Sequence, residues 1–326
     1  MLLKGIPVKS APTGTEHKGR RFILRLIGAA LLLAGLLAAV LGPVEMYCFY
    51  LFSEGGRFHY DGFGFGSFMF GNLAAQIMGY YLIAAVLIPL GYGTVTLQSW
   101  ARHLTLAALQ FWVVAGLPLI LATFFVLVSS KEAALPVVII AGVLLAASYL
   151  LLPRLAIRFY DSPGTRLSFK TRDANRAWVE TIPVPLLALG YLFSFFILIL
   201  HAHIFFNGMF PVFGIWLSGL TGIVLIGISI LSLLLLLWGT LRAKRWAWWG
   251  VLAYFSLMAL SYIITLLSSS WREILSTADF PTFEIEILQG IPLQGYHLSI
   301  LVGIPFLLTI GLILRARTHF GPQDRW

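Results

Sequence analysis

Charged residues are scarce in this sequence of 326 residues: Lys, Arg, Asp and Glu make up 11% of it, whereas 59% is hydrophobic. Soluble domains contain about a quarter charged residues. The longest polar stretch, residues 153–183, is too short to form a stable core of its own. With a mean hydropathy of +0.90, the composition excludes a soluble protein and predicts an integral membrane protein.

Cysteine and the familiar catalytic motifs are also missing. The single cysteine, Cys48, excludes an intrachain disulfide. The sequence contains no His-Glu-x-x-His, Gly-x-Ser-x-Gly or Cys-x-x-Cys motif and no glycine-rich phosphate-binding loop. Proteases and nucleotide-driven enzymes therefore lose support, and the sequence favours a non-catalytic protein over an enzyme.

The chain contains long runs of apolar residues. About 20 apolar residues are needed to cross a hydrocarbon core roughly 30 Å thick. Runs of this kind occupy residues 22–42, 73–92, 104–128, 135–152, 184–205, 212–238, 251–268 and 298–314. The sequence thus predicts an all-α protein with eight transmembrane helices, and no Asp, Glu or Lys falls inside any of these runs.

The loop charges predict the orientation of the helices. With eight spans, 19 of the 22 Lys and Arg residues fall on one side of the membrane, together with both termini. Lys and Arg in short loops stay on the cytoplasmic side. We therefore predict that both termini are cytoplasmic.

This topology divides the chain into two membrane halves with cytoplasmic connections. The predicted parts are the N-terminal tail 1–21, the first four-helix half 22–152, the basic linker 153–183, the second four-helix half 184–314 and the C-terminal tail 315–326.

The two halves resemble each other at two places. Gly93-Thr94 followed by Trp100-Ala101 matches Gly239-Thr240 followed by Trp246-Ala247 at a constant offset of 146 residues, and the exits of the fourth and eighth spans, 152–159 and 314–320, are also alike. Four spans per half would give both halves the same orientation, so the sequence suggests two parallel four-helix repeats. Chance matches between apolar sequences leave this duplication open.

Small residues that recur every four positions predict surfaces where helices approach closely. One strip consists of Ala30, Ala34, Ala38 and Gly42 in the first span. The other consists of Gly214, Ser218 and Gly222 in the sixth.

Two groups of residues are candidates for ligand contacts. The polar side chains of Gln76 and Gln110 lie in otherwise apolar spans. The first outer loop is rich in Gly and Phe, with Phe63, Phe65 and Phe68 able to cover a lipid, a quinone or another subunit. The outer stretch 274–296 is expected to lie beside this loop.

Four histidines on the predicted outer face form a second candidate site: His59, His201, His203 and His297. Imidazole groups bind zinc or copper, and two histidines on facing helices can hold a haem iron. Against this, positions two apart do not share a helix face, so His201 and His203 point apart. Interfacial imidazoles with no ligand are the plainer interpretation, and no cofactor is expected.

Three functions follow from these features. The first is a non-catalytic integral subunit or accessory protein of a membrane complex, with partner subunits in the membrane. The alternative is a carrier or binding protein for a hydrophobic or neutral ligand near Gln76 and Gln110. The third is a haem or metal redox protein that uses the outer histidines.

The charge balance also predicts where the protein resides. Its net charge of +9 needs no nucleic acid as a partner, because juxtamembrane Lys and Arg interact with anionic lipid at the inner face of the bilayer. Compact loops and the strong charge bias point to a plasma membrane, and in particular to a bacterial inner membrane.

Overall fold

The computed structural model describes residues 14–59, 64, 66–129, 135–170, 177–291 and 293–321. In chain order the elements are α1 (Gly14–Phe52), α2 (Phe68–Val95), α3 (Ser99–Ser129), α4 (Leu135–Ala146), the π-helix η1 (Ala147–Leu151), α5 (Leu152–Asp161), α6 (Pro163–Lys170), the 3-10 helix η2 (Trp178–Thr181), α7 (Val184–Ile204), β1 (Phe210–Val212), β2 (Ile215–Leu217), α8 (Gly219–Leu241), α9 (Arg245–Ser268), α10 (Trp271–Thr277), α11 (Thr282–Gln289), α12 (Gly295–Arg315) and the 3-10 helix η3 (Ala316–His319).

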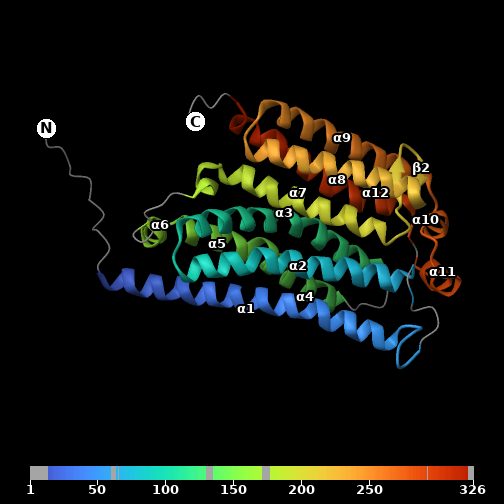
Figure 1. The fold of residues 1–326 in the computed structure, drawn as a ribbon, viewed down its shortest axis with the longest axis horizontal. Helices are drawn as coiled ribbons and strands as arrows, with labels where there is room; N and C mark the ends of the chain where they lie inside the picture. Colours follow the sequence, from blue (N-terminus) through green and yellow to red (C-terminus); the bar gives the residue numbers. More distant parts are fainter. Residues whose placement is uncertain are drawn as a thin grey trace.

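Eight helical segments are long and apolar enough to cross a membrane, with α4, η1 and α5 forming one of them. This confirms the helical, multi-pass membrane class. The hairpin β1–β2 is a departure from helix that the sequence did not predict. The eight segments run side by side along the long axis of the molecule (Figure 1).

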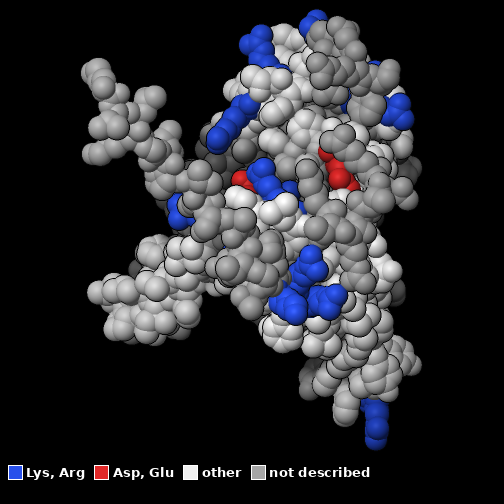
Figure 2. Space-filling view, turned by 90° about the vertical axis from the view of Figure 1, so that its left-hand side faces the viewer, with Lys and Arg blue, Asp and Glu red and all other residues white. Residues whose placement is uncertain are grey.

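The two ends of this bundle differ. The start of α1, the α2–α3 and α8–α9 turns, α6 and η3 lie at one end, and β1–β2, α10 and α11 lie at the other (Figure 1). Lys and Arg are spread over the face of the first end, where Asp and Glu are few (Figure 2). We call this the basic end.

Helix α1 packs against α2 with backbone in near contact. A Cβ atom added at Gly28 would lie 2.6 Å from the backbone nitrogen of Val95, and one added at Gly35 would lie 2.8 Å from the side chain of Ile88. Gly42 completes a row of glycines spaced by seven residues, and all three are buried. Seven residues are close to two helical turns, so the row stays on one face.

The predicted strips of small residues are therefore only partly correct. Ala38 is 6% exposed and belongs to the α1–α2 contact, but Ala30 and Ala34 are exposed. A spacing of four residues drifts around a helix by about 40° per step, whereas a spacing of seven drifts by only about 20°. The second strip does not lie along one helix, because Gly214 is in the hairpin turn and α8 begins only at Gly219.

The sixth span was predicted to start at residue 212. The hairpin occupies these residues, and α8 starts at Gly219. Phe213 and Gly214 adopt φ values of 42° and 102°, which turn the chain sharply. Their amide groups donate hydrogen bonds to the hydroxyl groups of Ser261 (3.1 Å) and Thr265 (2.9 Å) on α9. These bonds attach the hairpin to α9 and satisfy backbone groups that apolar surroundings would leave unpaired.

The α2–α3 and α8–α9 turns share one backbone geometry. Leu97 and Ala243 adopt φ values of 59° and 51°. Each amide donates to the carbonyl three residues earlier, that of Thr94 (3.2 Å) in the first turn and Thr240 (2.9 Å) in the second. Non-glycine residues rarely adopt such positive φ values, so their recurrence at an offset of 146 residues is specific.

Side-chain packing in the two turns matches as well. A Cβ atom added at Gly93 would lie 2.5 Å from the Cβ of Ala101, and one added at Gly239 would lie 2.7 Å from the Cβ of Ala247. In both turns the ring of the preceding tryptophan would be just as close, at 2.8 and 2.7 Å. Glycine is required at both positions because any side chain would meet these atoms.

Most of the hydrophobic core lies in the second half. Phe193 of α7 stacks on Phe255 of α9 with ring centroids 5.2 Å apart, and Phe196 lies 4.9 Å from Phe255 and 5.4 Å from Phe306 of α12. In the first half a smaller cluster joins Leu24, Leu97, Leu106, Tyr160 and Phe169.

The helix that contains the first predicted span is longer than the sequence predicted and carries an acidic residue. Residues 22–42 were expected to form the first span, but α1 continues through Pro43 to Phe52. Glu45 is therefore part of this helix rather than of an outer loop. A proline removes one backbone hydrogen bond, and a neighbouring helix can support the kink.

Candidate functional site

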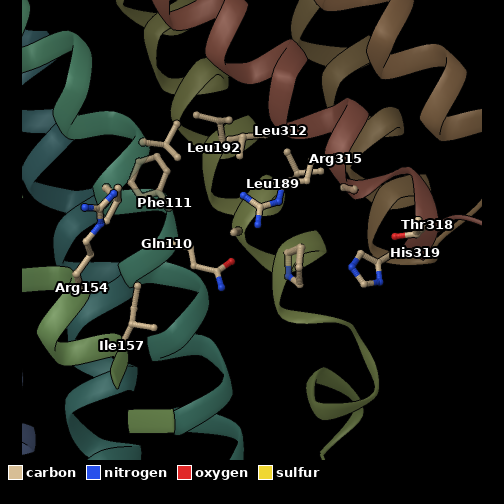
Figure 3. Close-up of a pocket in the computed structure, with 15 residues that line it drawn as sticks. Gln110, Phe111, Arg154, Ile157, Leu189, Leu192, Leu312, Arg315, Thr318 and His319 are labelled. Atoms are coloured by element: carbon tan, nitrogen blue, oxygen red, sulfur yellow. The ribbon is translucent and has the colours of Figure 1, made fainter. Parts of the chain in front are cut away.

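A cavity of about 570 Å³ lies at the basic end, between the two halves of the molecule. Its lining comes from α3 and from α5, which follows the fourth predicted span, and from α7, α12 and η3, of which η3 follows the eighth (Figure 3). A volume of this size is typical of small-molecule sites.

Three basic side chains, one amide and the hydroxyl of Thr318 supply the polar part of the lining. Arg154 projects from α5, Arg315 from the last turn of α12, His319 from η3 and Gln110 from α3 (Figure 3). In the described part of the chain the ion pairs are those of Asp161 with Arg102 (3.1 Å) and Arg166 (2.6 Å). Neither Arg154 nor Arg315 has an acidic partner there.

The rest of the lining is apolar. Phe111 of α3 faces Leu189 and Leu192 of α7, and Leu312 of α12 closes the wall (Figure 3). Leu189 and Leu192 are 2% and 5% exposed. The cavity thus places cationic groups next to a hydrocarbon wall, an arrangement suited to an amphiphilic ligand with a negative charge.

Contacts around the cavity hold the two helices that carry these arginines. Trp248 of α9 donates a hydrogen bond from its indole nitrogen to the carbonyl of Ile313 (3.0 Å), and the Arg317 guanidinium lies 5.3 Å from the Trp248 ring. These contacts hold the end of α12 that carries Arg315. On the other side, Arg102 donates to the backbone carbonyl of Tyr160 (2.8 Å) and so ties α5 to α3.

The linker before α7 is anchored to α3 by two further hydrogen bonds. Ser99 donates to the Glu180 carboxylate (2.5 Å), and a ring nitrogen of His103 lies 2.7 Å from the carbonyl of Ile182. Pro183 follows directly, and α7 begins at Val184. The first turn of α7 is thereby placed beside the cavity.

A second cavity of about 580 Å³ lies at the basic end, beside η2 and the α8–α9 turn. Trp178, Ile182 and Trp238 contribute apolar surface, and Arg242 and Lys244 contribute charge. The Arg242 guanidinium lies 4.7 Å from the Trp238 ring. Tryptophan beside basic residues is the usual composition of a membrane interface.

The predicted ligand contacts separate in the structure. Gln110 lines the cavity between the halves, but Gln76 lies toward the other end of α2, where its amide donates to the hydroxyl of Tyr80 (2.7 Å). Phe63 and Phe65 lie outside the described residues. Phe68 begins α2 and contacts Phe280 with ring centroids 5.6 Å apart.

That aromatic contact belongs to a cap at the end opposite the basic end, where the outer stretch lies beside the first outer loop as expected. Glu284 of α11 is 8% exposed. Its carboxylate accepts hydrogen bonds from the amides of Phe68 (2.6 Å) and Met69 (3.4 Å) and so caps α2. A carboxylate at a helix N-terminus is stabilised by the helix dipole.

The four predicted histidines have separate local partners. The Nδ1 atom of His201 lies 2.7 Å from the carbonyl oxygen of Ile197. The Nε2 atom of His203 lies 3.1 Å from the Tyr262 hydroxyl. His297 lies against aromatic rings, and His59 contacts the backbone of its own loop. Among the described residues no group of three or more His, Cys, Asp or Glu side chains could hold a metal ion.

Sequence reasoning missed Arg154, Arg315 and His319 as site residues. A signal was present, because these residues belong to the two similar span exits, 152–159 and 314–320. The similarity of the two exits suggests a duplication. It does not by itself predict that a cation from each exit lines the same cavity.

No protein-family model matches this chain, and comparisons with curated proteins and with solved structures also give no match.

Proposed function

We propose that this protein binds or carries an amphiphile with an anionic head group in the cavity between its halves. The observation that carries the proposal is the pair Arg154 and Arg315, which follow the last predicted span of each half. They have no acidic partners in the described chain and lie beside an apolar wall. The ligand would be a lipid-like molecule with a phosphate or carboxylate head. The sequence predicted a hydrophobic or neutral ligand, and the proposal replaces it with one that carries a negative charge.

The chemistry of the lining supports such a ligand. Arginine forms paired hydrogen bonds with phosphate and carboxylate groups, and charge-assisted bonds are about twice as strong as neutral ones. The Gln110 amide can donate a further bond. The apolar wall formed by Phe111, Leu192 and Leu312 would accommodate the first part of a hydrocarbon tail.

The orientation of the protein agrees with this role. We infer that the basic end faces the cytoplasm of a bacterial cell, because Lys and Arg concentrate there and are retained on that side. The cavity would then meet the inner leaflet of the plasma membrane, where anionic lipids are a source of ligand.

We further propose that the halves are two parallel repeats. The matching turns, with Leu97 and Ala243 in the same left-handed conformation and Gly93 and Gly239 in the same packing, support this. In a duplicated protein the cavity would lie at the junction of the repeats, where carriers commonly bind their substrates.

Lipid binding by purified variants tests the proposal. Hydrogen bonds to charged groups contribute about 1.5–3 kcal/mol each, so Arg154→Gln and Arg315→Gln should each weaken the binding of an anionic lipid by about tenfold or more. Native mass spectrometry with added phosphatidylglycerol measures this. Arg158→Gln, on the same helix but outside the cavity, is the matched control. Unchanged binding by the double variant would refute the proposal.

A role as a subunit of a membrane complex remains the second candidate. The span Leu135–Asp161 favours it, since only 6% of its most apolar window is buried within the chain, which leaves a long face for a partner helix. Gentle extraction followed by native mass spectrometry would detect such a partner at fixed stoichiometry. A lone chain would count against this candidate.

A further inference from the structure

Glu45 is an acidic residue within the membrane-spanning part of α1. It faces Tyr80 on α2, and Tyr80 lies 12 residues after Phe68 and 15 residues before Val95, at the two ends of that helix. At 1.5 Å per residue these separations are about 18 and 22 Å. Along the axis of α2 the carboxylate therefore lies near the middle of the helix, slightly away from the basic end. Glu45 and Tyr80 are half-buried there, and Gln76 is exposed.

Two donors from α2 approach one oxygen of this carboxylate. The Tyr80 hydroxyl donates to Oε1 at 2.8 Å, and the Gln76 amide lies 3.4 Å from the same atom. The second oxygen, Oε2, is shielded from solvent and has no hydrogen-bond partner within the described chain. Buried polar atoms are almost always paired with a protein group, an ordered water molecule or an ion.

Among the described residues, the ion pairs do not include Glu45. Helix α2 contains no charged residue, and the nearest charged residues along the chain on either side of Glu45 are Arg25 and Glu54. Arg57, beyond the end of α1, lies with its guanidinium 6.0 Å from the ring of Phe58. Ionisable groups in a membrane interior are costly and usually mark a functional site. A cation from outside the protein would remove that cost.

We propose that Glu45, Tyr80 and Gln76 form a binding site for a small monovalent cation, a proton or Na⁺, bound at Oε2. One carboxylate supplies the single negative charge that balances a monovalent cation. The Tyr80 hydroxyl and the Gln76 amide nitrogen hold the other oxygen, Oε1, so Oε2 is the atom left to take the cation. The groups that face Glu45 from α2 carry no charge.

Occupation of this site would stabilise the α1–α2 pair. The carboxylate sits one turn beyond Gly42, where a Cβ atom would lie 3.1 Å from the Tyr81 ring. A bound cation would neutralise the Glu45 carboxylate, and α1 and α2 could then stay in contact beside Gly42. The empty, charged form would favour separation and entry of water. The site is independent of the cavity at the basic end.

Thermal unfolding of the full-length protein in a neutral detergent tests the proposal. In choline chloride the midpoint should rise as the pH falls if the ligand is a proton. At alkaline pH it should rise when sodium chloride replaces choline chloride if the ligand is Na⁺. Glu45→Gln should abolish either response, whereas Glu54→Gln, just beyond α1, should respond as the unchanged protein does.

A second variant covers the case in which Glu45→Gln does not fold. Tyr80→Phe retains the carboxylate and removes one donor worth about 1.5 kcal/mol, which corresponds to a roughly tenfold change in the proton or Na⁺ concentration at half-response. The proposal is overturned if the unchanged protein responds to neither cation. It is also overturned if Glu45→Gln responds equally, or if Tyr80→Phe leaves the half-response unmoved.

Discussion

The two membrane halves share their basic-end turns but differ in how their helices are packed. In the second half, 44% of the most apolar window of the span Arg245–Ser268 is buried, against 22% for the span Phe68–Val95 in the first half. Aromatic rings around Phe255 join α7, α9 and α12. In the first half, glycines bring the backbones of α1 and α2 together.

This difference shows that one turn geometry is compatible with two packing modes. Between helices in a membrane, close backbone approach and interlocking side chains both provide van der Waals contact. A glycine row gives contact along one pair of helices, whereas an aromatic cluster joins several helices at one point. The first half is therefore expected to depend on a line of small residues and the second on a few large ones.

The largest expected effect comes from removing the centre of the aromatic cluster. Phe255 is 0% exposed, and Phe255→Ala should lower the free energy of unfolding by about 3–5 kcal/mol through the cavity that it leaves. Leu257→Ala on the same helix is the control, since Leu257 is 57% exposed. Thermal unfolding in detergent measures both, and equal effects would show that the cluster does not dominate this half.

The next largest effect is a difference in stability between equivalent substitutions in the two matching turns. Leu97 is 2% exposed and packs in the cluster with Leu24 and Tyr160. Leu97→Gly should cost about 2–4 kcal/mol, because lost packing outweighs relief of the left-handed backbone. Ala243→Gly relieves the same backbone and loses one methyl group, so stability should change by less than about 1 kcal/mol. Similar costs for both variants would contradict this division of roles.

The smallest of the three effects concerns the glycine row. Gly35→Leu should destabilise the α1–α2 pair by about 1–3 kcal/mol, because the new side chain meets both backbone and side-chain atoms of Ile88. Gly79→Leu on α2 is the matched control, since nothing lies within 4 Å of its added Cβ atom. Protease susceptibility of the α1–α2 loop and the unfolding midpoint report the effect. A harmless Gly35→Leu would mean that α1 is not held by close packing.

Much of the fold follows from the sequence, with failures at identifiable places. The eight apolar runs match eight helical segments. The predicted ends of these segments are wrong where the effect of a proline or a turn was misjudged. Pro43 does not end α1, and the residues around Gly214 form a hairpin instead of the start of α8. A proline within a span has no fixed outcome, because a neighbouring helix decides whether the freed backbone group is satisfied.

The candidate site was less accessible to sequence reasoning. Gln110 was identified because a polar residue stands out in an apolar run, and it does line the cavity. Gln76 stood out in the same way but is bound to Tyr80 and lies near Glu45. A polar residue in a span is expected to form a hydrogen bond with some partner. The sequence does not show which partner that is.

The sequence by itself determined the membrane class, the eight spans and the uneven distribution of Lys and Arg. These properties depend on the length of apolar runs and the charges beside them, both of which are local. The tertiary structure alone decided that Arg154 and Arg315 line one cavity and that Glu45 meets Tyr80. In a membrane the lipid-facing and helix-facing sides of a span are both apolar, so the sequence does not reveal which side turns inward.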